Sequence, residues 1–517
     1  MTNQPYFVST AIPYVNGRPH LGHAQEFVIT DALARFYRLR GRDVYFLSGT
    51  DDNSLKNVQA AAAEGLPTAE LVKRNADTFH HLRQPLDLSY DDFIRTSLDL
   101  RHAAGVEKLW RACAANGDIY RQSYGGLYCV GCEQFYTADE LEEGLCPEHK
   151  RPLEWVEEEN YFFRLSRYQQ PLIDLIEADQ LRIVPEKYKT ETLNFIRRGL
   201  DDFSISRSVE RARGWGIPVP DDPTQVIYVW YDALSNYITA LNYATENDCY
   251  QRYWSGNRER VHVIGKGIIR FHAIYWPAML LSAGVPLPTT IYVHDYVTVE
   301  GQKISKSLGN GADPAEVAAE WGTDPLRYYL LHEIHTTADG DFSQARLLNV
   351  YRHDLANQLG NLLNRVLTLA EKYTNGRVPA PHEPQADDQP LVDIATNLPD
   401  RLETAVQEFQ LHTALDLIWE LVNESNRYVD QTKPWVLFKQ SQTDSAAERR
   451  LHTVLYHLLE SLRLLGFYLR PFLPHTAARL NQQLNTAVAQ QWEDSIQWGQ
   501  LHPEHQLQSG EILFTPK

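Results

Sequence analysis

Short apolar runs and an amphipathic helix alternate near the start of the chain. Residues 6–11 and 43–48 are apolar runs of strand length, and residues 20–40 between them carry apolar side chains at helical spacing. Gly41 follows at a typical helix stop. A strand, a crossover helix and a second strand make a βαβ unit, in which the two strands lie parallel. The pattern therefore predicts the start of a Rossmann-like parallel sheet.

The same order of elements returns later in the chain. Residues 261–264 and 291–294 have the pattern of strands, and residues 268–283 between them have the pattern of a helix. A long segment separates the two βαβ units. We therefore expect one parallel sheet whose strands come from both stretches, split in the chain by an insertion.

Beyond Asp313 the spacing of apolar residues is helical. Residues 378–389 are rich in proline and aspartate and predict an exposed loop, after which helical spacing resumes and continues to about Leu484. The predicted fold class is α/β, a split Rossmann-like sheet followed by an α-helical domain. The expected segments are a first sheet half at 1–115, an insertion at 116–220, a second sheet half at 221–312, a linking helical segment at 313–375, and a helical domain with a C-terminal tail at 376–517, whose helices begin near residue 345.

Two histidines lie where the first strand leads into its helix, in the segment Pro19-His20-Leu21-Gly22-His23. Ligands of open parallel sheets bind outside the carboxyl ends of the strands, and a helix N-terminus there offers N–H groups to phosphate. The histidines are three residues apart and share a helical face, and Gly22 between them leaves room for a flat base against the backbone. The alternative is a pair of surface histidines on an ordinary helix, because a short motif is only a hypothesis.

A segment of small, polar and cationic residues follows the second βαβ unit, in the order Lys303-Ile304-Ser305-Lys306-Ser307. Gly301 ahead of it is the expected pivot. Such residues suit a loop that closes on a polyphosphate. The alternative is a solvated loop without a function. It is disfavoured because this order of residues is specific. It is also disfavoured because the segment follows the second βαβ unit while the histidine pair lies in the first βαβ unit.

The chain has five cysteines, and three of them fall close together. Cys129, Cys132, Cys146 and His149 form two close pairs with a modest gap between them. This spacing is typical of a tetrahedral structural zinc site, and four protein ligands leave no open position for water or substrate. We therefore expect one structural Zn²⁺. The alternative is a few buried cysteines beside a surface histidine.

The histidine pair and the lysine-containing loop together form the signature of class I aminoacyl-tRNA synthetases. The chain resembles the methionyl-tRNA synthetase family from about Tyr6 to about Pro474. Further segments that carry the resemblance, in family order, are Thr10-Ala11-Ile12-Pro13-Tyr14-Val15-Asn16-Gly17, Asp202-Phe203-Ser204-Ile205-Ser206-Arg207, Trp215-Gly216-Ile217-Pro218, Val229-Trp230-Tyr231-Asp232-Ala233, Arg270-Phe271-His272 and Tyr428-Val429-Asp430-Gln431-Thr432-Lys433-Pro434-Trp435.

The resemblance implies a reaction in which L-methionine and ATP form methionyl-adenylate, which then acylates the 3′ end of tRNA(Met), with Mg²⁺ on the ATP phosphates. It implies a zinc-bearing insertion and an anticodon-binding helical domain. The implied catalytic residues are His20, His23, Lys303 and Lys306, and the implied ATP-binding residues are Gly22, Gly265, Ser305, Lys306 and Ser307. The implied methionine pocket is Ala11, Ile12, Tyr14, Asp51, Trp230, Ala233, Tyr237, Ile268 and His272, and the implied anticodon-reading residues are Asn357, Asn361, Arg365 and Trp435. The residues alone leave open a core position for Trp230 and a solvated helix face for Asn357, Asn361 and Arg365.

Several positions depart from the family pattern. The chain has Asp52-Asn53-Ser54 where the family has Glu-His-Gly. Gly267 stands where the family has an aspartate that can bind ribose, and Asp295 stands where it has glycine. The C-terminal end also lacks the usual basic residues. We expect ATP to be held less tightly than in the family, with Asp295 as a partial replacement for the missing carboxylate.

Net charge limits the function classes only weakly. The 517-residue chain has a net charge of −18, which argues against a nonspecific nucleic-acid binder, whereas a tRNA enzyme needs only a local basic track. Without a long apolar stretch or a leader pattern, we expect a cytoplasmic protein with no membrane contact. We also expect a monomer.

Two other functions stay open. One is a paralog that activates an amino acid for a non-tRNA acceptor, and the other is a non-catalytic tRNA-binding protein. The presence of Trp435, Asn361 and Arg365 argues against the first, and that of His20 and Lys306 against the second.

Overall fold

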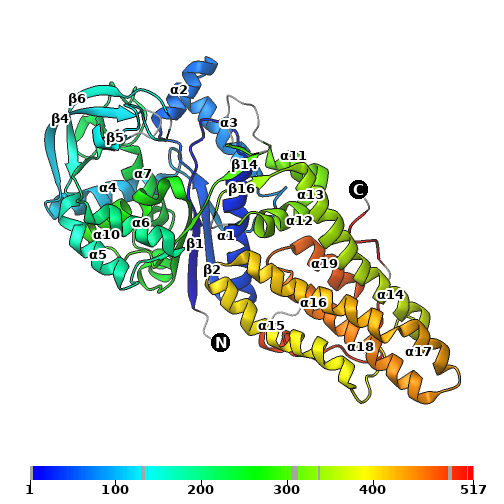
Figure 1. The fold of residues 1–517 in the computed structure, drawn as a ribbon. Helices are drawn as coiled ribbons and strands as arrows, with labels where there is room; N and C mark the ends of the chain where they lie inside the picture. Colours follow the sequence, from blue (N-terminus) through cyan, green and yellow to red (C-terminus); the bar gives the residue numbers. More distant parts are fainter. Residues whose placement is uncertain are drawn as a thin grey trace.

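A parallel sheet forms the centre of the catalytic half (Figure 1). The computed structural model describes residues 4–129, 134–136, 138–148, 150–299, 301–303, 312–335, 338–486, 492–508, 510–515 and 517. The sheet has six strands in the order β3 (Asp92–Arg95), β2 (Asp43–Thr50), β1 (Pro5–Thr10), β12 (Arg260–Gly265), β13 (Thr290–His294) and β7 (Arg182–Val184). β1 pairs in parallel with β12, so the two predicted βαβ units form one sheet, as expected.

Two edge strands of this sheet were not predicted from the sequence. β3 and β7 have four and three residues, too short for a periodic signal. β7 lies within the range expected for the insertion, yet it pairs in parallel with β13. The segment between the two sheet halves therefore returns to the main sheet before the chain enters β12.

The first predicted helix forms as α1 (Leu21–Leu39), with His20 at its N-cap. The second predicted helix is divided into a π-turn, η5 (Phe271–Tyr275), and the helix α10 (Trp276–Ala283). Pro277 in the first turn of α10 has no N–H to donate to the preceding turn, which accounts for the wider turn ahead of it.

The insertion carries an antiparallel sheet in the order β5 (Gln134–Tyr136), β4 (Ile119–Cys129), β6 (Glu154–Phe163) and β8 (Phe203–Ser204). β4 ends at Cys129, which the sequence predicts as a zinc ligand. Helices α5 (Gln169–Glu177) and α6 (Glu186–Arg197) flank β7 in the chain. A second small sheet contains β9 (Ser206–Ser208), β10 (Pro218–Val219) and β11 (Asp222–Ile227).

A further small sheet follows β13, in the order β15 (Gln302–Lys303), β14 (Val297–Val299) and β16 (Gly340–Phe342). β16 lies in a region whose pattern predicted only helices, and it pairs in parallel with β14. Gly301, the predicted pivot, turns the β14–β15 hairpin with φ +72°, a conformation that favours glycine.

The C-terminal half is helical, and in Figure 1 its far end lies well away from the sheet. After α11 (Pro314–Trp321), α12 (Thr323–Tyr328), the π-turn η6 (Tyr329–Glu333) and α13 (Gln344–Val350), the chain continues as the π-helix η7 (Tyr351–Gly360), α14 (Asn361–Thr374), α15 (Gln389–Gln407), α16 (Leu411–Thr432), α17 (Pro434–Ser441), α18 (Ser445–Tyr468) and α19 (Pro474–Gln483). The tail after the short helix α20 (Trp492–Ser495) folds back, and the Tyr351 hydroxyl donates to the Thr515 carbonyl at 2.8 Å. No helix among the described residues is long and apolar enough to cross a membrane.

Two apolar cores lie on the two faces of the sheet. Side chains of successive strand residues point to opposite faces, so Tyr6 and Val8 join one core and Phe7 joins the other. The first core is continuous with the helical half, and α1 lies between the two parts (Figure 1). The helical half is thereby fixed against the sheet that carries the candidate site.

Candidate active site

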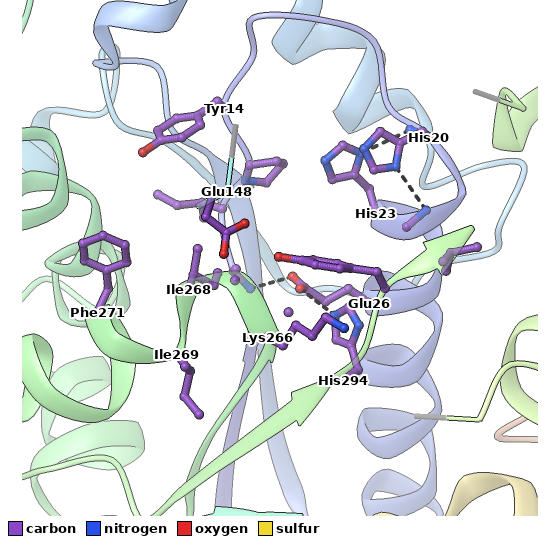
Figure 2. A pocket seen from close by; sticks show the side chains of 18 of the residues that line it. Tyr14, His20, His23, Glu26, Glu148, Lys266, Ile268, Ile269, Phe271 and His294 are labelled. Atoms are coloured by element: carbon purple, nitrogen blue, oxygen red, sulfur yellow. Dashed lines mark hydrogen bonds and ion pairs between the residues drawn. The ribbon is translucent and has the colours of Figure 1, made fainter. Parts of the chain in front are cut away.

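A cavity of about 600 Å³ opens at the carboxyl ends of β1, β12 and β13, beside the N-terminus of α1. This is the edge at which parallel α/β sheets bind ligands. Figure 2 shows His20 and His23 on one side of the cavity and Tyr14, Ile268 and Phe271 on another. The predicted site residues that line it are Ala11, Ile12, Tyr14, His20, Gly22, His23, Trp230, Gly265 and Ile268.

His20 and His23 lie face to face, with ring centroids 3.8 Å apart. The Gly22 N–H donates to Nδ1 of His20 at 3.1 Å, and the His20 N–H donates to Nδ1 of His23 at 3.1 Å. Each Nδ1 is therefore an acceptor, so a neutral ring carries its proton on Nε2. The arrangement caps α1 and leaves both rings with an Nε2–H, the donor that a phosphate oxygen requires.

Gly22 has a structural role that the sequence did not suggest. A Cβ atom at this position would lie 3.0 Å from Cε1 of the His20 ring. The room above Gly22 is therefore filled by the imidazole of His20, not left for a flat base as expected. The glycine allows His20 to fold over the helix N-terminus and cap it.

The opposite part of the cavity is aromatic and apolar. Trp230 stacks on Phe271 with ring centroids 3.7 Å apart, and Tyr14 meets the edge of Trp230 at 6.1 Å. Ile12 and Ile268 line the same cavity. Aromatic and aliphatic walls of this kind suit a thioether, which is apolar and polarizable.

Behind this wall lie Tyr237 and His272, both fully buried. Nδ1 of His272 lies 3.0 Å from the Ile268 carbonyl, which only accepts, so Nδ1 carries the proton and Nε2 accepts from the Tyr237 hydroxyl at 2.7 Å. Burial lowers the pKa of His272 to about 4, so the ring is neutral at physiological pH. Tyr237, His272 and Ala233 do not line the cavity but lie within the buried side of the site.

Asp51 is also buried, and its backbone pairs with Tyr14 of the cavity wall. Its Oδ1 accepts the Asn53 N–H at 3.2 Å. The Asn53 side-chain amide donates to Asp232 Oδ2 at 2.7 Å, and the other Asp232 oxygen bonds His102 Nε2. Asn53, one of the departures from the family pattern, thus links the carboxylate of Asp51 to a buried Asp232–His102 pair.

Comparisons with known proteins agree with this geometry. Residues 6–153 and 150–367 match the family described as tRNA synthetases class I (M), and residues 378–516 match the anticodon binding domain of methionyl tRNA ligase. The methionine–tRNA ligase of Caldanaerobacter subterraneus subsp. tengcongensis is 44% identical over 98% of this chain and 78% of its own length. The methionine–tRNA ligase of Brucella suis is 44% identical over 93% of this chain and 92% of its own length.

The chain belongs to the methionyl-tRNA synthetase family. A solved structure of Mycobacterium tuberculosis methionyl-tRNA synthetase bound by methionyl-adenylate superposes with a TM-score of 0.94 at 41% identity, covering 99% of this chain and all of that one. The resemblance inferred from the motifs and the predicted fold class are thereby confirmed. A class I synthetase sheet is followed by a helical anticodon-binding domain.

Asp295, the expected partial replacement for the carboxylate that the family carries at position 267, lines the cavity and is engaged by protein groups. It is buried, paired with Lys187 and with Lys266 at 3.0 Å, and it accepts from the Tyr188 hydroxyl at 2.7 Å. Although burial opposes it, these hydrogen bonds hold the pKa of Asp295 below its usual range. The carboxylate is charged, and its partners are protein groups.

Gly267 lies against Tyr296. A Cβ atom at Gly267 would lie 2.2 Å from the Tyr296 hydroxyl oxygen, so the aspartate of other synthetases of the family cannot enter this position unless the tyrosine moves. Both residues line the cavity.

Only part of the signature loop and of the predicted zinc site lies within the described residues. Lys303 is the last residue of β15, while Ser305, Lys306 and Ser307 lie outside the described part. Cys129 and Cys146 are buried in a small apolar cluster with Tyr136, and Cys132 and His149 lie outside the described part. Two of four predicted ligands therefore share one buried cluster, which is compatible with a thiolate-rich metal site.

The predicted anticodon residues lie on η7, α14 and α17 of the helical half. Asn357 is exposed on η7, and Asn361 is exposed at the start of α14. The guanidinium of Arg365 lies 5.5 Å from the ring centre of Trp435 on α17 and pairs with Asp430. Figure 1 places α14 and α17 side by side, away from the sheet.

Several cavity residues were not among the site residues predicted from the sequence, and Glu26, His294, Phe271 and Glu148 are four of them. Glu26 on α1 accepts the Ala11 N–H at 2.8 Å and pairs with Nε2 of His294 at 3.0 Å, and both side chains face the cavity in Figure 2. Phe271 stood inside a recognised segment, and Glu148 stood beside a predicted zinc ligand. The signal that would have found Glu26 is a carboxylate on the apolar face of the first helix, three residues after His23.

Proposed function

We propose that this chain catalyses both steps of methionyl-tRNA formation: activation of L-methionine by ATP and transfer to tRNA(Met). The observation that carries the proposal is one cavity in which a capped histidine pair lies opposite a subsite walled by aromatic and aliphatic side chains. Anionic phosphates and an apolar amino-acid side chain would bind side by side in it. Attack of the methionine carboxylate on the α-phosphate requires this juxtaposition.

In this proposal His20 and His23 donate Nε2–H to phosphate oxygens as charge develops there. Gly22, Gly265 and the signature loop, from Lys303 through Ser305, Lys306 and Ser307, contact the remaining phosphates. Mg²⁺ accompanies ATP as part of the substrate. Little covalent help from the protein is needed, because phosphoryl chemistry depends on positioning and charge neutralisation.

The methionine side chain is proposed to lie between Ile12, Tyr14, Trp230 and Ile268, with Ala11, Ala233, Tyr237 and His272 shaping the pocket. Asp51 is proposed to hold the methionine ammonium. The His272 ring is neutral and adds no charge behind the aromatic wall. Discrimination by the shape of this wall is worth about 1–3 kcal/mol for one methylene.

We further propose one structural Zn²⁺ held by Cys129, Cys132, Cys146 and His149. The burial of Cys129 and Cys146 in one apolar cluster supports it. The ion would supply folding free energy to the insertion. Tyr136 and Glu148, next to predicted ligands, line the cavity, so order in this insertion would also shape the active site.

The proposed partner is tRNA(Met), read at its anticodon by Asn357, Asn361, Arg365 and Trp435 through stacking and hydrogen bonds to splayed bases. We propose a monomer that acts in the cytoplasm, where translation takes place. The segment assignments proposed for the helical half are a linking segment at 313–375 and an anticodon-binding domain at 376–517.

The test is amino-acid-dependent ATP–pyrophosphate exchange with each of the twenty amino acids, followed by charging of tRNA. Methionine should give the highest kcat/KM, and charging should require tRNA(Met). Exchange without charging would favour a paralog with another acceptor. Absence of exchange with every amino acid would favour a non-catalytic tRNA-binding protein.

A further inference from the structure

Glu26 and Asp295 are two of the carboxylates that line the cavity, and both are engaged by protein groups. Glu26 accepts the Ala11 N–H and pairs with His294. Asp295 is surrounded by Lys187, Lys266 and the Tyr188 hydroxyl. A sugar hydroxyl that enters here would have to share these two carboxylates with their protein partners, which favours an additional hydrogen-bonding group.

Tyr296 places a hydroxyl at this side, directly over Gly267. Its oxygen occupies the space that a side chain at position 267 would need, 2.2 Å from an ideal Cβ. The backbone of Tyr296 is fixed, because its N–H donates to Asp339 at 3.0 Å and its carbonyl accepts the Gly340 N–H at 3.0 Å. The Lys266 ammonium lies 4.7 Å from the ring centre. The backbone hydrogen bonds and the Lys266 contact therefore position the ring.

Resting on the proposed function, we propose that the Tyr296 hydroxyl binds a ribose hydroxyl of ATP, in the place of a carboxylate at position 267. Gly267 and Tyr296 come from the turns after β12 and β13, adjacent parallel strands whose carboxyl ends form the cavity floor. A nucleoside bound beside the N-terminus of α1 would lie across these ends. The glycine and the tyrosine thus form one subsite.

A phenol suits this position better than another carboxylate would. Asp295 and Asp339 already lie on this side, both paired to Lys266, and a further anion would compete with them for that ammonium. Burial raises the pKa of Tyr296 to about 12, so the hydroxyl keeps its proton at neutral pH. It can both donate to and accept from a sugar hydroxyl.

The test compares the wild type, Tyr296→Phe and the double variant Gly267→Asp/Tyr296→Phe in methionine-dependent exchange with ATP, 2′-deoxyATP and 3′-deoxyATP. Tyr296→Phe should raise the KM for ATP roughly three- to tenfold, the worth of one neutral hydrogen bond. The KM for methionine should not change. For the deoxy analogue that lacks the bonded hydroxyl, the substitution should have no further effect.

The double variant provides a rescue. Without the hydroxyl, the nearest Tyr296 ring atom to a Cβ at position 267 is Cζ at 3.4 Å, an ordinary contact. The introduced carboxylate should then accept from the ribose and lower the KM for ATP below that of Tyr296→Phe. Tyr90→Phe, which loses a hydroxyl bonded to the His80 carbonyl outside the cavity, is the control and should leave the KM for ATP unchanged.

The inference is overturned if Tyr296→Phe leaves the KM for ATP unchanged, or if it raises the KM of ATP and of both deoxy analogues equally. A double variant no better than Tyr296→Phe would also overturn the shared subsite. If the wild type shows no exchange, the proposed function fails separately. Equilibrium dialysis with ATP then makes the same comparison through binding alone.

Discussion

At the scale of single residues, the site depends on neighbouring residues that hold its functional side chains in position. The His20 ring lies over Gly22, and Asn53 holds the carboxylate of Asp51 while it is itself held by Asp232. In each arrangement a backbone N–H is the donor, that of Gly22 to His20 and that of Asn53 to Asp51. The side chain that accepts the hydrogen bond therefore determines the geometry. Asn53, a departure from the family pattern, is thereby part of the site.

Asn53→Ala is predicted to raise the KM for methionine with little change in the KM for ATP. The variant keeps its backbone N–H toward Asp51 but loses the link to Asp232, so the Asp51 carboxylate is less firmly positioned. The lost donor also leaves Asp232 with fewer partners, at a cost of about 1–3 kcal/mol of stability. Exchange kinetics and urea unfolding measure the two effects.

Asn116→Ala is the matched control for Asn53→Ala. It removes an amide that donates to Asp118 at 2.8 Å, outside the cavity. It should alter stability without moving either KM. Equal increases in the KM values of both substrates for Asn53→Ala would show a general loss of structure instead of a role at Asp51.

At the scale of elements, two parts of the chain outside the main sheet carry the predicted zinc ligands and the predicted anticodon residues. β4 and β6 extend the insertion toward the predicted zinc ligands, and α14 with α17 forms the end that bears the predicted anticodon residues. One substitution tests each of these two parts of the chain, and it should leave the function of the other part unchanged.

Cys129→Ser is predicted to release the zinc and to lower exchange activity, because metal binding supplies folding free energy to the insertion. The wild type should contain one equivalent of zinc by elemental analysis. Cys249→Ser, outside the predicted ligand set, should retain that equivalent. Full activity in metal-free protein would rule out a structural zinc.

Trp435→Ala is predicted to raise the KM for tRNA while leaving exchange almost intact, since loss of base stacking costs roughly 1–3 kcal/mol. Phe438→Ala on the same helix removes a stack on Tyr373 at 4.1 Å and serves as the control for a structural effect. Charging kinetics at varied tRNA concentration measure both. Parallel damage to exchange and charging would mark Trp435 as a folding residue.

At the scale of the whole molecule, a buried arginine joins the two halves. Arg327 on α12 is fully buried and pairs with Asp31 of α1 at 2.8 Å. Its other hydrogen bonds go to the carbonyls of Leu86, Pro471 and Phe472. The catalytic sheet and the helical half therefore share one charged contact inside a continuous apolar core.

Arg327→Met is predicted to destabilise the protein by about 3–5 kcal/mol, because it leaves a buried carboxylate short of its partner. Although burial opposes it, Arg327 and Arg35 hold the pKa of Asp31 below its usual range. The contribution of Asp31 to the free energy of unfolding is thus fully present above the pKa of Asp31 in the unfolded chain, which is near 4. It is lost as the pH falls through the lower pKa of Asp31 in the folded protein.

Urea unfolding across pH measures this effect. The difference between wild type and Arg327→Met should be largest above about pH 4 and shrink below it. Arg401→Met, which breaks an exposed pair with Glu420, should cost no more than about 1 kcal/mol. A similar loss in both variants would contradict the proposed role of Arg327.

Local sequence was sufficient to predict the family, the split parallel sheet, the helical C-terminal half and the residues of the histidine pair. These features depend on local periodicity, caps and ordered motifs, which neighbouring residues define. Tertiary structure decided the rest. The short edge strands β3 and β7 exist only because longer strands template them, and Asp295 is engaged only because Lys187, Tyr188 and Lys266 come together from distant segments. Gly267 and Tyr296 form a pair for the same reason: contacts between the ends of adjacent strands depend on sheet order, which local sequence does not encode.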